Sequence, residues 1–444
     1  MAPWARAAAE GEPRDPTPSS PRPPPPRGEY ERIDWARVHA RSTLASSYCV
    51  RKGLTRKAQL AVNLKKWVAK RPASPLAPAL PETYVLQVDD VDYIEEAMAD
   101  IPEVRDAEAG AGRWVVKPSV ANRAAGVAVI DSAPALAAAL AAQPNMREWV
   151  VQRYVDPPAL LGGRKWHARV YALAVGALDV FALTDGLALR SRAPYAGAGL
   201  DDLDAHLTNT CRAAGGEAAG GESGDDDGAP PPPRPAPVPL TPDEEADTIL
   251  LLSELPDALV ADGMGRREAE AKVAGVLAAT AALVGETFAA VASELSFFAL
   301  PSAFELFGFD FLVAADWTVW LLEVNADPDV GATGARCAPL ARALVEGALR
   351  LTADTLAAKA GGGRGGGGGG GGGGVRAAPS GGACFRATRG ARARPGWWCP
   401  DAVLLSDALR GRRAGGGASA RESSSRRQGL GFRFRPCSFW GFRA

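Results

Sequence analysis

The stretch FGFDFLVAADWTVWLLEVNADPD, from Phe307 to Asp329, carries acidic side chains inside two apolar runs. Each run is apolar apart from one acid, Asp310 in the first and Glu323 in the second. The residues between the runs, Ala-Ala-Asp-Trp at 314–317, predict a hairpin that joins two strands. Because side chains two apart on a strand share a face, Glu323 and Asn325 are expected to point the same way.

The expected hairpin register brings the two acids close together. With a loop of two or four residues, Val313 is expected opposite Thr318 and Glu323 opposite Gly308, so that Asp310 lies diagonal to Glu323, ~7 Å away at most. Two buried carboxylates and an amide need a cation, and a set of hard oxygen ligands indicates Mg²⁺ rather than zinc. The alternative is an edge hairpin with solvated acids, which the apolar neighbours disfavour.

The composition narrows the class of protein. The chain has 444 residues, a formal net charge of −1, six cysteines without a CxxC pair and three scattered histidines, which argues against a structural zinc site. The N-terminus has no apolar region of a secretory signal, and the longest apolar run stops at Glu286, short of the ~18 residues of a membrane span. We therefore expect a reduced, soluble, cytoplasmic protein with no membrane contact.

Composition shifts divide the chain into folded and low-complexity parts. The expected segments are a disordered Pro-rich N-terminus at 1–29, an N-terminal subdomain at 30–110, a central subdomain at 111–155, a C-terminal subdomain at 156–358 with a disordered insertion at 212–243, and a Gly/Arg-rich tail at 359–444.

The tail is the only basic segment of note. Residues 375–444 contain 14 arginines and 3 acids, a net charge of +11, and several arginines stand beside aromatic residues. Such a segment could bind a polyanion, which is the one route by which nucleic acid is expected as a partner. The favoured alternative is an unstructured end without a selected role.

A cation and a loop upstream of the hairpin predict phosphate binding. In RWVVKPSVANRAAGVAVI, a strand ends near Lys117 and a loop with Asn122, Arg123 and Gly126 precedes the next strand. Such a loop can fold over a triphosphate through its backbone N–H groups and a cation. It is not a Walker loop, because GxxxxGK[ST] is absent.

A second strand places several polar side chains on one face. In GGRKWHARVYALAV, Lys165, His167, Arg169 and Tyr171 alternate with apolar residues. A solvated outer face is the alternative reading of this alternation. Arg190, in LALRSRAPY, adds a further cation.

The segment WVVQRYV at 149–155 is the expected hinge, where Gln152 and Tyr154 would contact a purine. HLTNT at 206–210 adds a polar cluster that includes Asn209.

Together these segments predict ATP and Mg²⁺ binding through Lys117 and Lys165. Arg169 and Arg190 would then be left for a second anion. A carboxylate that attacks the γ-phosphate would give an acyl phosphate, which an amine then opens.

These motifs, with SYCVRKGLTRK before them, occur in the order of the tubulin–tyrosine ligase family of ATP-grasp enzymes, which the chain resembles over residues 47–350 without the insertion. Similarity is greatest to the short fungal members. The resemblance implies an α+β ATP-grasp fold, in which antiparallel sheets with flanking helices hold a nucleotide between subdomains. It also implies an ATP- and Mg²⁺-dependent ligase that joins a free amino acid to a protein acceptor, with tubulin as the expected acceptor.

The resemblance also implies a role for each matching residue. These roles are phosphate lysine for Lys117, nucleotide lysine for Lys165, acyl-phosphate and amino-acid contacts for Arg169 and Arg190, and Mg²⁺ ligands for Asp310, Glu323 and Asn325. The loop, the hinge, the strand and the polar cluster described above supply the remaining predicted nucleotide contacts, which are Asn122, Arg123, Gly126, Gln152, Tyr154, His167 and Asn209.

Three residues depart from the family pattern. His167 stands where most members have Asp, Ala124 stands where a glycine is usual, and Asp327 replaces a small residue. The first two could lower activity or change the substrate. Two other functions therefore stay open: a nucleotide-binding pseudoenzyme that acts through a partner, and an RNA-associated interaction protein that acts through its tail.

Overall fold

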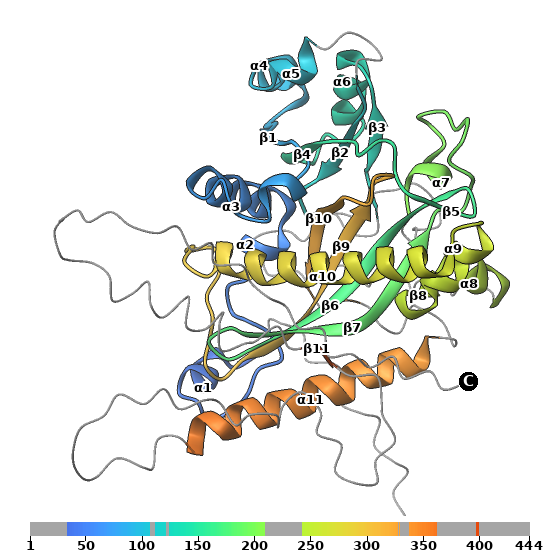
Figure 1. Cartoon of the computed structure of the whole chain (residues 1–444). Coiled ribbons are helices and arrows are strands. Elements are labelled where there is room, and N and C mark those ends of the chain that lie inside the picture. The colour runs from blue at the N-terminus through green and yellow to red at the C-terminus, as the bar shows by residue number, and fades with distance from the viewer. Residues whose placement is uncertain are drawn as a thin grey trace, which may run out of the picture.

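The computed structural model describes residues 33–106, 112–120, 124–208, 242–326, 328, 337–361 and 397–398. Within these residues the chain forms two antiparallel sheets with helices packed on them (Figure 1), which confirms the predicted α+β class. The predicted site residues Asn122, Arg123 and Asn209, and the departure at Asp327, lie outside the described residues.

The smaller sheet has the strand order β1-β4-β2-β3. Its strands are β1 (Thr83–Gln87), β2 (Trp114–Pro118), β3 (Ala128–Ile130) and β4 (Glu148–Arg153). Helices α4 (Ile94–Ala99), α5 (Pro102–Arg105) and α6 (Ala133–Ala141) pack on one face, around the buried Trp114 and Trp149. Because side chains alternate along a strand, Lys117 and Gln152 project from the opposite face.

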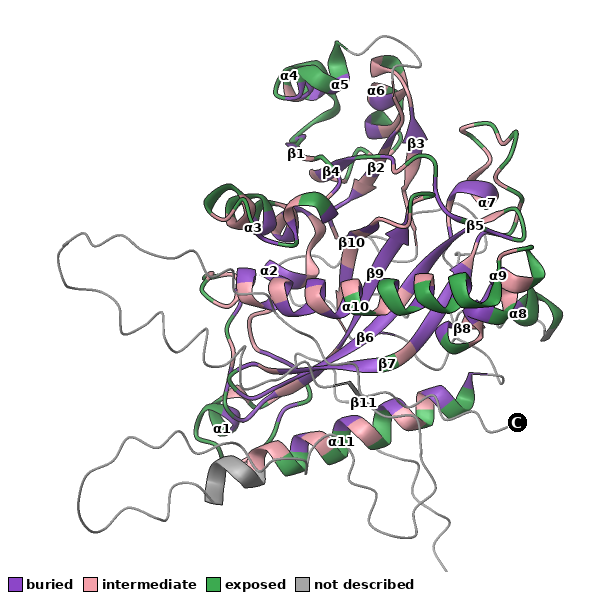
Figure 2. Ribbon diagram, viewed as in Figure 1, coloured by how far each residue is buried: buried purple, intermediate pink, exposed green. Residues whose placement is uncertain are grey.

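The larger sheet has the order β10-β9-β6-β7-β11, with β5 paired to β6 and β8 paired to β7. Its strands are β5 (Leu160–Leu161), β6 (Arg164–Val175), β7 (Asp179–Arg190), β8 (Ile249–Leu251), β9 (Phe304–Val313), β10 (Val319–Ala326) and β11 (Trp397–Trp398). Figure 2 shows that β6 and β9 are buried along most of their length.

Helices cover both faces of the larger sheet. On one face, Trp166, Ala168 and Val170 of β6 join a core with Val273 and Phe288 of α10 (Arg266–Val291). On the other face, Tyr171 and Leu173 join a core with Leu340 and Leu344 of α11 (Ala338–Gly361). The alternation that the sequence predicts for this strand is therefore present.

The remaining helices are short or lie at the edges of the sheets. They are α1 (Trp35–His39), α2 (Lys52–Thr55), α3 (Lys57–Lys70), α7 (Leu203–His206), α8 (Pro242–Thr248) and α9 (Leu255–Ala261), with 3-10 turns at Ala77–Ala79, Val91–Tyr93 and Leu252–Glu254. Among the described residues one helix, α10, is long and apolar enough to cross a membrane by length and composition alone, and 56% of its apolar window is buried in the protein, as in a core helix.

The register of the decisive hairpin differs from the prediction. Val313 lies opposite Val319 rather than Thr318, because the N–H of Ala314 bonds to the carbonyl of Thr318 at 2.9 Å and so closes a longer loop. A β-bulge between Leu321 and Glu323 then shifts the ladder by one residue.

The bulge changes which residues face each other. Glu323 lies directly opposite Asp310, and Asn325 lies opposite Gly308. The predicted diagonal relationship between the two acids is therefore wrong. Their shared face is retained, and the acids are closer neighbours than the sequence predicts.

Candidate active site

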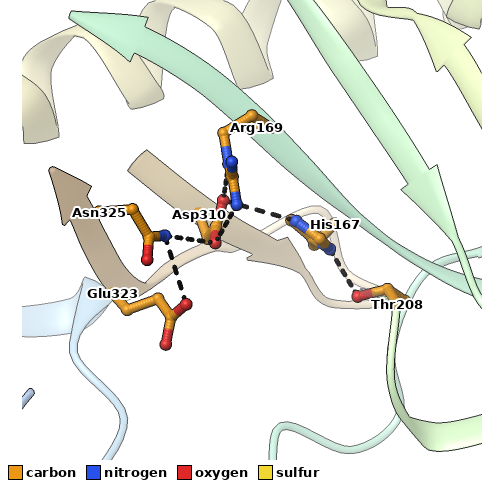
Figure 3. A network of polar contacts seen from close by, with 6 residues as sticks. All are labelled: His167, Arg169, Thr208, Asp310, Glu323 and Asn325. Atoms are coloured by element: carbon orange, nitrogen blue, oxygen red, sulfur yellow. Dashed lines mark hydrogen bonds and ion pairs between the residues drawn. The ribbon is translucent and has the colours of Figure 1, made fainter. Parts of the chain in front are cut away.

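The two acids and the amide of the hairpin lie together on the edge strand β10 and its neighbour β9 (Figure 3). Nδ2 of Asn325 donates to Oδ2 of Asp310 at 3.1 Å and to Oε1 of Glu323 at 3.3 Å. Asp310 is only 4% exposed, so its carboxylate depends on protein partners rather than on water. The three predicted Mg²⁺ ligands are thus brought together.

Arg169 is the main partner of Asp310. It lies directly opposite Asp310 on the neighbouring strands β6 and β9, and its Nε and Nη2 bind both carboxylate oxygens, with the Nη2–Oδ2 distance at 2.8 Å. Burial alone would raise the pKa of Asp310, but the Arg169 guanidinium, helped by His167, holds that pKa well below its usual range. The prediction that Arg169 contacts a separate anion stays a prediction, and the structure adds that its guanidinium contacts a predicted metal ligand.

A glycine gives Arg169 room to reach this carboxylate. A Cβ placed on Gly308 would lie 3.1 Å from Cδ of Arg169 and 3.1 Å from Cβ of Pro328. The absence of a side chain at Gly308, two residues before Asp310, therefore leaves room for the Arg169 side chain.

His167 contacts the same carboxylate from the side. Its Nε2 lies 3.5 Å from Oδ1 of Asp310, and its Nδ1 is hydrogen-bonded to the hydroxyl of Thr208. The ring is buried, and its Nε2 has no well-formed hydrogen bond within the described structure. His167 thus faces the acid cluster from β6, beside Arg169.

Two lysines lie on the strands around the hinge, and one of them, Lys117, interacts electrostatically with Glu323 and Asp310. Nζ of Lys117 donates to Oε1 of Gln152 at 2.9 Å, and Nζ of Lys165 donates to the hydroxyl of Tyr154 at 2.9 Å. Burial lowers the pKa of Lys117. Burial, followed by repulsion from Lys117, lowers the pKa of Lys165 to about 7. Cations held in such surroundings favour an anionic ligand.

The structure places Arg190 away from Arg169. Arg190 lies opposite Trp166, and directly opposed residues of an antiparallel pair share a face, so Arg190 starts from the α10-covered face of the sheet. Its Nη2 lies 3.8 Å from Oδ1 of Asp247 in α8, which also binds Arg164. The prediction that Arg169 and Arg190 grip one anion is therefore not supported by this geometry.

The loop that was expected to cover a triphosphate is described only at its end. Ala124 has φ +58° and Gly126 has φ +68°, both in the left-handed region that glycine adopts without strain. The backbone of Ala124 is therefore strained, at the position where a glycine is usual in the family that the sequence resembles.

Three residues of the site were missed by the sequence reasoning. Nζ of Lys57, at the start of α3, lies 3.5 Å from Oε2 of Glu323. Nδ1 of His206 is hydrogen-bonded to the Tyr154 hydroxyl at 2.9 Å, and the Thr208 hydroxyl is hydrogen-bonded to Nδ1 of His167. The motifs SYCVRKGLTRK and HLTNTC contained these residues, but only the tertiary fold shows which side chains reach the site.

The residues present fit ATP and Mg²⁺. Lys57, Lys117 and Arg169 surround two carboxylates, Asp310 and Glu323, and Lys165 lies beside Lys117, which leaves positive charge for phosphate groups. Among the described residues no group of three or more His, Cys, Asp and Glu could hold a metal alone. Two carboxylates and an amide suit Mg²⁺, which usually completes its shell with phosphate oxygens and water.

A cavity beside these cations provides room for an organic ligand. It has a volume of about 330 Å³ and is lined by Lys57, Lys117 and Gln152 together with apolar residues of α3 and β10, including Leu64 and Leu321. Apolar walls that end in a few polar groups are typical of small-molecule sites.

Two antiparallel sheets that enclose buried lysines and a pair of carboxylates define a protein of the ATP-grasp class. The C-terminal domain of K. lactis Pby1, described as an ATP-grasp enzyme that interacts with the mRNA decapping enzyme Dcp2, superposes with a TM-score of 0.52 at 25% identity. The superposition covers 74% of this chain and 82% of that domain. The predicted ATP-grasp fold is confirmed.

The chain belongs to the tubulin-tyrosine ligase family, whose model matches residues 44–215 and 265–360. A probable tubulin–tyrosine ligase of Schizosaccharomyces pombe is 27% identical over 350 residues, which cover 69% of this chain and 76% of the relative. The probable tubulin–tyrosine ligase PBY1 of Saccharomyces cerevisiae is 26% identical, and the alignment covers 69% of this chain but only 42% of that protein. The human tubulin monoglycylase TTLL3 is 23% identical over 62% of this chain and 33% of its own length.

Proposed function

We propose that this protein is a cytoplasmic ATP- and Mg²⁺-dependent ligase that joins a free amino acid to a carboxylate of a protein acceptor, with tubulin as the acceptor. The observation that carries the proposal is the convergence of Lys57, Lys117 and Arg169 on the Asp310–Glu323 pair, with Lys165 beside Lys117. The tubulin acceptor rests on the names of the relatives, which include two probable tubulin–tyrosine ligases and a tubulin monoglycylase.

Different residues of the site bind the phosphate groups and the metal. Lys117 and Lys165 neutralise phosphate oxygens, and their lowered pKa values, caused first by burial, make an anionic ligand a stabilising partner. Asp310, Glu323 and Asn325 would hold Mg²⁺, which neutralises charge on the phosphate oxygens when bound. Burial alone would raise the pKa of Glu323, but Lys57, together with Lys117 and Arg169, holds that pKa below its usual value and so keeps the carboxylate ionised.

The reaction consists of two transfers that balance. An oxygen of the acceptor carboxylate bonds to the γ-phosphorus of ATP, the bond to the β-phosphate oxygen breaks, and ADP leaves. The amine of the amino acid then bonds to the acyl carbon, the carbon–oxygen bond to phosphate breaks, and inorganic phosphate leaves with formation of an amide. Positioning and charge neutralisation supply the rate enhancement, because no step requires a protein nucleophile.

Trapping with hydroxylamine tests this proposal. Hydroxylamine captures an acyl phosphate as a hydroxamate, so purified protein with ATP, Mg²⁺ and the acceptor should yield hydroxamate and ADP in equal amounts. Lys165→Met should lose this product, whereas Lys70→Met, which changes an exposed lysine of α3, should retain it. ADP formation without hydroxamate in the wild type would overturn the acyl-phosphate route.

A second function is favoured by the pairing of Arg169 with both oxygens of Asp310. If that pair persists with nucleotide bound, Asp310 does not serve a metal, and the protein binds nucleotide without turnover and acts through a partner. The similarity to the Pby1 domain makes an mRNA decapping enzyme the candidate partner for this function. Nucleotide binding in a titration, together with no ADP release in the presence of acceptor, distinguishes this function from the ligase.

A further inference from the structure

A chain of hydrogen bonds runs from Lys165 through Tyr154 and His206 to the backbone at Gly199. Nζ of Lys165 donates to the Tyr154 hydroxyl at 2.9 Å, and that hydroxyl is hydrogen-bonded to Nδ1 of His206 at 2.9 Å. Nε2 of His206 lies 3.0 Å from the carbonyl oxygen of Gly199. The three side chains are buried, with Lys165 at 7%, Tyr154 at 5% and His206 at 2% exposure. Their polar atoms therefore depend on one another rather than on water.

The carbonyl at the end of this chain fixes the direction of each bond. A carbonyl oxygen only accepts, so Nε2 of His206 carries the proton, and in the neutral ring Nδ1 then has the lone pair. Burial lowers the pKa of His206, which favours the neutral ring. The Tyr154 hydroxyl therefore donates its proton to Nδ1 of His206. Its oxygen is left to accept from the Lys165 ammonium, which has donors only.

The aromatic neighbours of this chain are consistent with the same direction. Nζ of Lys165 lies 4.0 Å from the centroid of the Tyr154 ring, and Tyr195 packs edge-on against His206 with ring centroids 5.7 Å apart. The Tyr195 hydroxyl also interacts with that of Tyr154, but it donates its own proton to Oδ1 of Asp156 at 2.9 Å. The proton of Tyr195 thus does not compete with Lys165 for the Tyr154 oxygen.

We propose that His206 is a positioning residue for nucleotide binding, which holds the proton of the Tyr154 hydroxyl and so keeps the hydroxyl oxygen as the acceptor that orients the Lys165 ammonium. The inference rests on the proposed binding of phosphate by Lys165. An ammonium has three N–H donors, so the bond to Tyr154 leaves two for a phosphate group. Without an acceptor at Nδ1, the hydroxyl can turn its proton toward Lys165, and its oxygen then no longer orients the ammonium.

The proposal gives α7 a part in binding that acts through another residue. This short helix ends at His206 and contacts β6, the strand that carries Lys165 (Figure 1). His206 would therefore change nucleotide affinity through the Tyr154 hydroxyl and not through a contact of its own with the ligand.

The test measures the affinity of the full-length protein for a nucleotide. A non-hydrolysable ATP analogue is titrated calorimetrically in the presence of Mg²⁺, and thermal unfolding of each variant is recorded beside it. His206→Leu removes both ring nitrogens. In His206→Asn the side-chain oxygen can take the place of Nδ1, and in His206→Gln the amide N–H can take the place of Nε2 only. Tyr154→Phe removes the hydroxyl and keeps the ring.

We expect His206→Leu and His206→Gln to weaken binding of the analogue by ~10-fold, the scale of one hydrogen bond that involves a charged group. His206→Asn should stay close to the wild-type affinity, because it keeps an acceptor for the Tyr154 proton. The loss from His206→Leu should disappear when Tyr154 is already Phe, since the effect passes through that hydroxyl. A merely structural role would weaken His206→Asn and His206→Gln alike, in step with their thermal stability.

Three results would overturn the inference. Unchanged affinity in His206→Leu, or an equal loss with and without the Tyr154 hydroxyl, refutes it and leaves the proposed function intact. Wild-type affinity in Lys165→Met refutes it as well, because Lys165 would then not bind the nucleotide. No binding of the analogue by the wild type refutes the proposed function too. If His206→Leu does not fold, the comparison of His206→Asn with His206→Gln decides.

Discussion

Arg169 on β6 and Asp310 on β9 lie directly opposite each other, and the guanidinium binds both oxygens of the buried carboxylate. A bidentate pair of this kind is oriented as well as strong, because the planar guanidinium matches the carboxylate. It joins the strand that carries His167 and Lys165 to the hairpin that carries Glu323 and Asn325. The pair is thus both a structural link of the larger sheet and a part of the candidate active site.

Replacing one residue of this pair should destabilise the fold more than replacing both. Arg169→Met leaves the Asp310 carboxylate buried without its main partner, so the free energy of unfolding should fall by ~3 kcal/mol or more. The double variant Arg169→Met/Asp310→Leu buries no uncompensated charge and should recover much of that loss. Urea unfolding of the wild type, both single variants and the double variant measures the coupling. Additive losses would show that the two residues do not depend on each other.

Stability should rise with pH because of Lys165. Burial and Lys117 lower the pKa of folded Lys165 to about 7, whereas an unfolded lysine titrates near 10.4. Between these values the unfolded chain binds more protons than the folded protein, so the free energy of unfolding increases as the pH rises through this window. Below pH 7 both states are protonated and the contribution is constant.

Unfolding titrations from pH 6 to 9 test this effect. Lys165→Met should flatten the pH dependence in that range relative to the wild type, and Lys70→Met, on the exposed surface of α3, should leave it unchanged. An identical slope in Lys165→Met would show that Lys165 keeps an ordinary pKa in the folded protein.

Glu323 should be required for the metal-dependent step and not for the fold. Glu323→Gln removes a charge that faces Asp310 and Lys57, and we expect ATP turnover to fall by at least ~100-fold, the loss seen when a charge-stabilising group of a transition state is removed. The matched control is Glu294→Gln, which breaks the ion pair with Lys66 at the surface of the protein. Comparable turnover in the two variants would exclude Glu323 from the metal site.

The insertion before α8 should be dispensable, whereas α8 itself should not. Deletion of residues 212–241 shortens a connection and is expected to act mainly through the entropy of loop closure. The free energy of unfolding should therefore change by less than ~1 kcal/mol in either direction. Extending the deletion to 248 also removes Asp247, the partner of Arg164 and Arg190, and should destabilise the protein further. Thermal unfolding of both deletions measures the difference, and a large loss from the shorter deletion would mean that the insertion packs on the core.

The local patterns of the site could be predicted from the sequence because a strand has a period of two. Single acids in the apolar runs around Asp310 and Glu323, and the alternation through Lys165 and Arg169, identify polar positions on otherwise buried strands. The hairpin pattern also predicted that Asp310 and Glu323 lie close together. The reasoning therefore found both acids and two of the lysines, but not the contacts of the hairpin with β6 and α3.

The pairings depend on tertiary structure that local patterns do not contain. β6 and β9 are far apart in sequence, so the contact of Arg169 with Asp310 could not be read from either segment. The bulge before Glu323 shifts the register by one residue and has no local signature in WLLEVN. Similarly, Thr208 and Lys57 reach the site only because α7 and α3 pack beside it.

The proposed ligase activity joins an amino acid to a protein acceptor at the expense of ATP. The most direct measurement is an incubation of the purified chain with Mg²⁺-ATP, purified tubulin and a mixture of labelled amino acids, followed by mass spectrometry of the acceptor. We expect one kind of amino acid to be attached through an amide bond, with one ADP formed per residue added, and no product with Glu323→Gln. The protein would not be such a ligase if it bound ATP tightly but attached no labelled amino acid to tubulin or to any other protein of a cell extract.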